Sequence, residues 1–238
     1  MQAAAAATSG TNGPYVVATR SLWQLISALF YRVAAPGARG NAAVGSIVPP
    51  HSSNPDDLPI SFGYKTAWIA VRSSDGRVLA ESLGLKQIER CSWADGIDKA
   101  YKLRGVFVSP PIDEWTIAVG SLPEAGQDRF LPDLEEISRR FAHVFYFGTH
   151  RIVGYQAWAI AEKGHVRRAH AWLGERGEFL LNIGERTPEE VDLGTGLEDS
   201  ENAPDEETVL ELASRWVLDP RELDQHTEAR GPGLIGTS

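Results

Sequence analysis

The stretch YQAWAIAEKGHVRRAHAWL, residues 155–173, decides the fold class because it predicts a β-hairpin. Two largely apolar runs, residues 155–162 and 165–173, flank the dipeptide Lys163-Gly164. A two-residue connection that contains glycine is typical of the primed turns that join antiparallel strands. The register set by this turn predicts one shared face for two sets of side chains: Tyr155, Ala157, Ala159 and Ala161 from the first strand, and Val166, Arg168, His170 and Trp172 from the second.

Strand and helix patterns alternate along the rest of the chain. We expect strands at residues 66–71, 106–108, 115–119, 143–148 and 179–183, and helices at residues 74–83, 92–101, 132–141 and 204–216. The clearest helix begins at Pro132, because acidic residues occupy its first turn and basic residues its last, which complements the helix dipole. This order predicts an α+β fold, a split βαβ (ferredoxin-like) sheet with an antiparallel hairpin extension.

Composition divides the chain into three parts. Residues 1–59 combine an alanine run, an apolar stretch and a connection rich in proline and glycine, which predicts an N-terminal extension and linker that is partly disordered. Residues 60–220 hold most of the tryptophans and predict a single α+β domain, whereas residues 221–238 are typical of a loose C-terminal tail. The apolar stretch at residues 22–35 contains Arg32 and is too short to span a bilayer. We therefore expect a soluble, cytoplasmic protein without a membrane span.

The acidity of the chain is concentrated in one segment. The formal net charge is −9, and residues 185–207 hold ten acidic residues and one basic residue, so the remainder is neutral overall. Such a segment is either a solvated loop or an electrostatic lure for a basic protein partner. Both alternatives disfavour nucleic acid as the ligand, because no basic stripe offsets the acidity. The candidate interaction residues of this segment are Glu198, Asp199 and Glu201.

No pattern typical of a catalytic or cofactor site is present in the sequence. There is no Gly-rich phosphate loop between a strand and a helix, and no G-x-S-x-G nucleophile pattern. Cys91 is the single cysteine, which excludes an internal disulfide and a cysteine-based metal cage. The six histidines are not spaced to converge on one ion. We therefore predict no catalytic residues, no metal site and no cofactor.

One polar and aromatic cluster is a candidate interaction site. His150, Arg151 and Tyr155 lie between the strand at 143–148 and the hairpin, and Tyr146 and Trp172 belong to the strands on either side. Aromatic side chains with an arginine are typical of protein contacts. A histidine that titrates near neutrality beside an arginine that holds anions also suits a small acid–base site. A third alternative is a strand end followed by a polar turn, with no function beyond the fold.

Four segments resemble a family of bacterial proteins of unknown function: KTAW at residues 65–68, SPP at 109–111, WTIAVG at 115–120 and FGTHR at 147–151. The resemblance covers about residues 64–220 and implies no activity. By size and charge the chain is also similar to immunity proteins of bacterial toxin systems. These features predict a non-catalytic protein-binding module, such as an immunity-type inhibitor of a basic partner. The alternative is a small enzyme that acts on an anionic substrate through His150, Arg151 and Tyr155.

Overall fold

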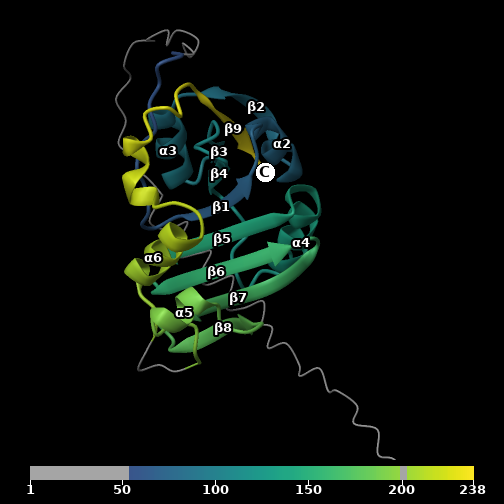
Figure 1. Cartoon of the computed structure of the whole chain (residues 1–238), viewed down its shortest axis with the longest axis vertical. Coiled ribbons are helices and arrows are strands. Elements are labelled where there is room, and N and C mark those ends of the chain that lie inside the picture. The colour runs from purple at the N-terminus through teal and green to yellow at the C-terminus, as the bar shows by residue number, and fades with distance from the viewer. Residues whose placement is uncertain (1–53, 199–202) are drawn as a thin grey trace, which may run out of the picture.

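The described strands form one antiparallel sheet. The computed structural model describes residues 54–198 and 203–238, and the strands in them pair in the order β2-β9-β3-β4-β1-β5-β6-β7-β8 (Figure 1). The strands are β1 Ala67–Arg72, β2 Lys86–Cys91, β3 Val106–Val108, β4 Trp115–Gly120, β5 His143–His150, β6 Tyr155–Glu162, β7 His165–Leu173, β8 Glu178–Ile183 and β9 Gly233–Thr237. The helices are α2 Gly76–Ser82, α3 Trp93–Tyr101, α4 Phe130–Phe141, α5 Pro188–Asp192, α6 Glu206–Trp216 and the 3-10 helix η2 Pro220–Gln225.

Helices cover both faces of the sheet. On one face, which we call the α4 face, α2 and α4 pack against the strands, and on the other, the α6 face, α3 and α6 do so. In the central strand β1, Ile69 belongs to the core of the α4 face, whereas Trp68 and Ala70 belong to that of the α6 face. None of these three side chains is more than 2% exposed. Burial on both faces explains why β1 is a continuous apolar run and not an alternating one.

The amphipathic helix α4 covers much of the α4 face. Its side chains Phe130, Leu134 and Ile137 are buried against the sheet. Phe130 packs edge-on against Tyr146 of β5, with ring centroids 4.8 Å apart. The structure therefore confirms the predicted helix and shows that it begins at Phe130, two residues before Pro132.

The expected ferredoxin-like sheet with a hairpin extension is wrong. β9 and β2 extend the sheet beyond β3, while β6, β7 and β8 extend it beyond β5, and helices lie on both faces. The sequence of β2, KQIERC, shows no strand pattern because it is mostly charged and exposed. Such a composition suits a strand at the edge of a sheet, where charge protects against unwanted pairing. The fold is thus a nine-stranded antiparallel sheet between two layers of helices.

Residues 221–238 belong to the fold and are not the loose tail that their composition indicates. They form η2 and β9, and β9 pairs with β2 on one side and β3 on the other. The glycines in this segment suggest a tail, but close packing requires one of them. A Cβ at Gly233 would lie 2.4 Å from the carbonyl oxygen of Val108. Ile235 of the same strand is buried in the core of the α6 face.

The predicted hairpin is confirmed, but one of its predicted faces is wrong. β6 and β7 pair through Lys163 and Gly164, which both have the positive φ that a type I′ turn requires. The register shifts next to Ala161, so that Arg167 is an extra residue in β7 and the alternation of side chains reverses beyond it. Three side chains therefore lie on the α6 face, opposite to the predicted side: Arg168, His170 and Trp172.

The predictions for the N-terminal part fall mostly outside the described residues. Residues 1–53, which include the apolar stretch at 22–35, are not described. Within the predicted linker, the carboxylate of Asp57 accepts a hydrogen bond from the backbone N–H of Trp93 at 2.7 Å, at the start of α3. Among the helices in the described part of the chain, none has the length and apolar character needed to cross a bilayer.

Removing residues 231–238 should abolish cooperative unfolding, because β9 is an interior strand of the sheet. The substitution Ile235→Ala should lower the free energy of unfolding by about 2–4 kcal/mol, since it empties a buried position. The control Thr237→Ala, at an exposed position of the same strand, should change it by less than about 0.5 kcal/mol. Urea unfolding followed by tryptophan fluorescence measures these effects. A truncated chain that unfolds as cooperatively as the full chain would show that the tail is loose after all.

Candidate functional site

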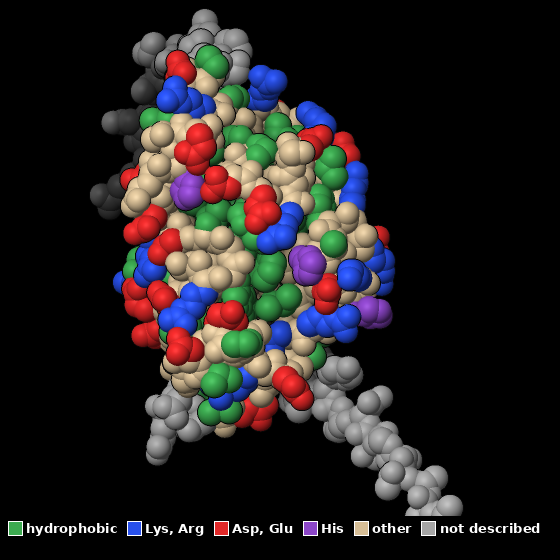
Figure 2. Space-filling model, in the orientation of Figure 1, with side chains coloured by type: hydrophobic (Ala, Val, Ile, Leu, Met, Phe, Trp, Pro, Cys, Tyr) green, Lys and Arg blue, Asp and Glu red, His purple; other side chains and the backbone are tan. Residues whose placement is uncertain are grey.

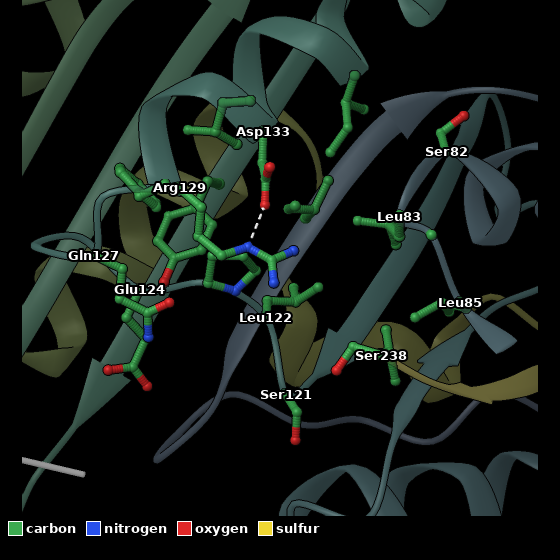
Figure 3. Close-up of a pocket in the computed structure, with 18 of the residues that line it drawn as sticks. Ser82, Leu83, Leu85, Ser121, Leu122, Glu124, Gln127, Arg129, Asp133 and Ser238 are labelled. Carbon is green, nitrogen blue, oxygen red and sulfur yellow. Dashed lines mark hydrogen bonds and ion pairs between the residues drawn. The ribbon is translucent and has the colours of Figure 1, made fainter.

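A cleft opens on the α4 face between the end of α2, the helix α4 and the loop that follows β4 (Figure 3). We call it the α4 cleft, and its volume is about 440 Å³. Ile69 of β1, Val106 of β3 and Tyr146 of β5 contribute to its floor. The loop at residues 121–129 lines one side of it. The cleft therefore brings together segments that are far apart in the sequence.

The α4 cleft combines apolar walls with a polar end. In Figure 3, Leu83 and Leu85, which follow α2, lie on one side of Leu122, and Glu124 and Gln127 lie on the other. Apolar residues of α4 also line the cleft. A ligand with an apolar stem and one polar group would match this distribution.

Two backbone features position the loop that carries Glu124. β4 ends at Gly120, whose φ is 131° and where a Cβ would lie 2.4 Å from the carbonyl oxygen of Gly105, so glycine is required. Further along, the backbone N–H of Ala125 donates a hydrogen bond to the hydroxyl oxygen of Tyr155 at 2.9 Å. This hydrogen bond ties the loop to β6. Ala125 is also buried, so Glu124, the residue before it, is held at the cleft.

The carboxyl group of Glu124 is partly enclosed and lacks a compensating partner. Its Oε2 atom is shielded from solvent and has no hydrogen-bond partner among the residues that the structure describes. Burial strips water from the carboxylate, and this desolvation raises the pKa of Glu124 to about 8. Desolvation is the cause of the shift, without a contribution from any charge in the described part of the chain. At neutral pH the side chain is therefore mostly a neutral carboxylic acid.

Two buried tyrosines lie beside the Glu124 end of the cleft. The hydroxyl oxygens of Tyr146 and Tyr155 are 3.4 Å apart, and burial raises the pKa of both. The charge of an ionised Glu124 raises these pKa values further, which shows that the carboxyl and both hydroxyls share one electrostatic environment. Hydrogen bonds connect the backbone N–H of Ala125 with the hydroxyl of Tyr155, and that hydroxyl with the hydroxyl of Tyr146. Tyr146 in turn lines the cleft.

The other charges of the cleft belong to α4 and its N-cap. Arg129 Nε donates to Asp133 Oδ2 at 2.8 Å across the first turn of the helix, as the dashed line in Figure 3 shows. Glu136 forms an ion pair with Arg139. The lining therefore includes three acidic side chains and one basic one. The basic one, Arg129, is already paired with Asp133.

Residues of the predicted site around His150 and Arg151 interact with other parts of the fold. Arg151 Nε donates to Oε2 of Glu206, at the start of α6, at 2.6 Å, and its guanidinium lies 5.2 Å from the centre of the Tyr64 ring. His150 ends β5, and burial lowers its pKa although the nearby charge of Glu206 opposes the shift. These contacts connect the end of β5 to α6.

The structure brings together two members of the predicted cluster and separates the rest. Tyr146 and Tyr155 meet in the core of the α4 face, beside the α4 cleft. Trp172 lies on the opposite face and packs on Phe179, with ring centroids 4.5 Å apart. Arg151 extends toward α6, so no single surface presents all the predicted residues.

The acidic segment is largely engaged within the fold. The carboxylate of Glu190 is fully buried and accepts hydrogen bonds from Arg168 Nη2 and Trp158 Nε1, each at 2.8 Å. Three further acids form ion pairs: Asp192 with Arg215, Glu206 with Arg151, and Glu207 with Arg221. Figure 2 shows acidic and basic side chains interleaved on the face in view. Of the predicted interaction residues, Glu198 is exposed, whereas Asp199 and Glu201 lie outside the described residues.

One surface group has ligand atoms close enough to hold a metal ion. Side-chain atoms of Asp113, His226 and Glu228 lie within 4.8 Å of one another. His226 Nδ1 is 3.2 Å from Glu228 Oε1, and both carboxylates are exposed. Ordinary surface hydrogen bonding accounts for this arrangement, so we assign no metal site to it.

Sequence reasoning missed Glu124. Its segment, SLPEAGQDR at residues 121–129, has the composition of a solvated loop. The enclosure of the carboxyl depends on tertiary contacts of this loop, such as the hydrogen bond from Ala125 to Tyr155 of β6, which no local pattern reports.

Comparison of the chain with protein-family models, with curated proteins and with solved structures finds no match in any of the three. These comparisons therefore do not support the resemblances noted in the sequence. We infer a function from the geometry of the α4 cleft.

The contribution of Glu124 to the free energy of unfolding should fall as the pH rises from about 4.5 to about 8. The unfolded chain releases this proton near the ordinary value of 4.5, whereas the folded chain retains it up to about 8. Because the folded state binds more protons in this window, its stability decreases with pH, by at most ~1.4 kcal/mol per unit.

The variant Glu124→Gln should lack this contribution and should gain stability over the wild type between pH 5 and pH 8. Urea unfolding at both pH values measures the difference, which isolates Glu124 from the other titrating groups. Glu175→Gln, in the exposed turn after β7, is the control for loss of one charge and should follow the wild type. Equal effects of Glu124→Gln at both pH values would contradict the raised pKa.

Proposed function

We propose that the protein is a non-catalytic binding protein with a basic protein partner, and that the α4 cleft is the site where it holds this partner. The observation that carries the proposal is the chemistry of the cleft, a hollow of about 440 Å³ with more acidic than basic side chains. It contains a carboxyl, that of Glu124, without a compensating group in the described part of the chain. A cation supplied by another molecule would provide that group.

A second buried carboxylate supports this proposal by contrast. Glu190 is compensated internally, because Arg168 and Trp158 donate to it. Arg168 in turn donates to the side chain of Asn182 at 2.6 Å and to the carbonyl oxygen of Gly196 at 3.1 Å. Buried polar groups of native proteins nearly always have partners. An enclosed carboxyl that lines an open cleft without a partner therefore has the properties of a ligand-binding group.

The acidic segment has a secondary part in this function. Exposed acids such as Glu198 would attract a basic partner over a distance. Four of the other acids, Glu190, Asp192, Glu206 and Glu207, are already paired with arginines, so they add little to a specific contact. We therefore assign long-range attraction to the segment and the specific contact to the cleft. An immunity-type inhibitor of a basic toxin would be a protein of this class.

The alternative function, a small enzyme that acts on an anionic substrate through His150, Arg151 and Tyr155, has less support. General acid–base catalysis needs its groups within hydrogen-bond reach of one substrate. Arg151 is engaged by Glu206, and the hydroxyl of Tyr155 is enclosed where it accepts from Ala125. None of the three predicted residues lines the α4 cleft.

A fluorescein-labelled octalysine peptide is a suitable probe of the proposed function. Fluorescence anisotropy at physiological ionic strength should show binding to the wild type that weakens as salt is added. Ser121→Trp, which fills the cleft at its rim, should weaken binding by about tenfold or more. The matched control Ser74→Trp, at an exposed position before α2, should bind as the wild type does. If both variants bind the peptide equally well, the cleft is not the binding site and the proposal is wrong.

A further inference from the structure

The group that would compensate Glu124 can be specified from the geometry of the α4 cleft. Oε2 is the carboxyl oxygen that is enclosed without a partner among the described residues. A guanidinium binds best to both oxygens of a carboxylate at once, whereas an ammonium is a compact point charge that needs one. Because Oε2 is shielded from solvent, a ligand in the cleft cannot engage both oxygens side by side, and this favours an ammonium group.

The approach to Glu124 is suited to an aliphatic stem. Leu83 and Leu85 lie across the cleft from Glu124, and Leu122 lies between them (Figure 3). A lysine side chain carries its ammonium on four methylene groups, which pack along apolar surface while the charge seeks polar partners. An alkylammonium group placed along this path would contact leucines with its stem and Glu124 with its head.

Tyr146 provides a second oxygen at the same end of the cleft. An ammonium has three donors, and one carboxylate oxygen satisfies one of them. Tyr146 lines the cleft, and the charge of an ionised Glu124 raises the pKa of its hydroxyl. Behind it, Tyr155 is anchored by the N–H of Ala125, so both hydroxyls are held in place.

We propose that the α4 cleft binds a primary ammonium group, that of a lysine side chain of the partner, through the carboxylate of Glu124. This inference rests on the function proposed above, since it names the group of the basic partner that enters the cleft. It also assigns Glu124 a role that neither the acidic segment nor the His150 region supplies.

Binding of the ammonium is coupled to release of a proton. In the free protein Glu124 is protonated at pH 7, because burial raises its pKa to about 8. The ligand arrives already protonated, so the carboxyl proton passes to solvent and an N⁺–H···⁻O hydrogen bond takes its place. Tyr146 and Tyr155 remain protonated throughout. Arg129, Asp133 and Glu136 are the charged side chains that line the cleft from the α4 side.

Three six-carbon probes separate the possible ligand chemistries: hexylamine, hexanol and hexanoate. Isothermal titration calorimetry at pH 7, in phosphate and in Tris buffer, reports affinity and the number of protons released. Hexylamine should bind at least about tenfold more tightly than the other two and should release close to one proton. Its apparent affinity should rise by up to about tenfold per pH unit between pH 6 and pH 8 and then level off.

Two variants assign these effects to Glu124. Glu124→Gln keeps the shape of the side chain and should bind hexylamine at least about tenfold more weakly, with no proton release and unchanged affinity for hexanol. Asp128→Asn, at an exposed position of the same loop, is the matched control and should behave as the wild type. Unfolding measured in parallel shows that each variant is folded.

Several results would overturn the inference. Equal affinity for hexylamine and hexanol would show that no charge is recognised, and tighter binding of hexanoate would show an anion site. Unchanged hexylamine binding by Glu124→Gln would assign recognition to another residue. In each case the octalysine test with Ser121→Trp still decides separately whether the cleft binds a basic partner, so failure of the ammonium assignment is distinct from failure of the proposed function.

Discussion

The burial of the sheet on both faces is the constraint on which the rest of the structure depends. Helices cover each side, so the buried side chains of the central strands belong to one of two cores, and a shift of one residue moves a side chain from one core to the other. The bulge at Arg167 shows the effect, because it places Arg168 on the α6 face, where Glu190 meets it. The same constraint puts Tyr146 and Tyr155 on the α4 face, where Tyr146 contributes to the floor of the α4 cleft.

Two enclosed carboxyl groups, those of Glu190 and Glu124, differ in how their burial is compensated. Glu190 is enclosed together with Arg168, and breaking such a pair is costly because it leaves an uncompensated charge. Glu124 is enclosed at the edge of a cleft with no such partner in the described chain, and it avoids the cost by staying protonated. A ligand that brings a positive charge would convert this neutral acid into half of an ion pair.

Local patterns in the sequence predict the elements of the fold better than their arrangement. The type I′ hairpin follows from Lys163-Gly164, and α4 follows from its charged ends, because these signals are local. β2 and β9 were missed because an edge strand tolerates charge and because Gly233 reflects close packing against Val108, a contact between distant segments. The site was harder to predict for the same reason. Arg151 has a suggestive residue type but is paired with Glu206 of α6, whereas Glu124 looks like a loop residue until the tertiary contacts enclose it.

Carbon-13 NMR of the Glu124 carboxyl group measures its protonation state most directly. With glutamate labelled at the side-chain carboxyl and the signal assigned by comparison with Glu124→Gln, the chemical shift is followed from pH 4 to pH 10. We expect a titration near pH 8 in the free protein that moves toward the ordinary value of 4.5 when hexylamine is present. A titration near 4.5 in the free protein, or one that hexylamine leaves in place, would contradict this expectation.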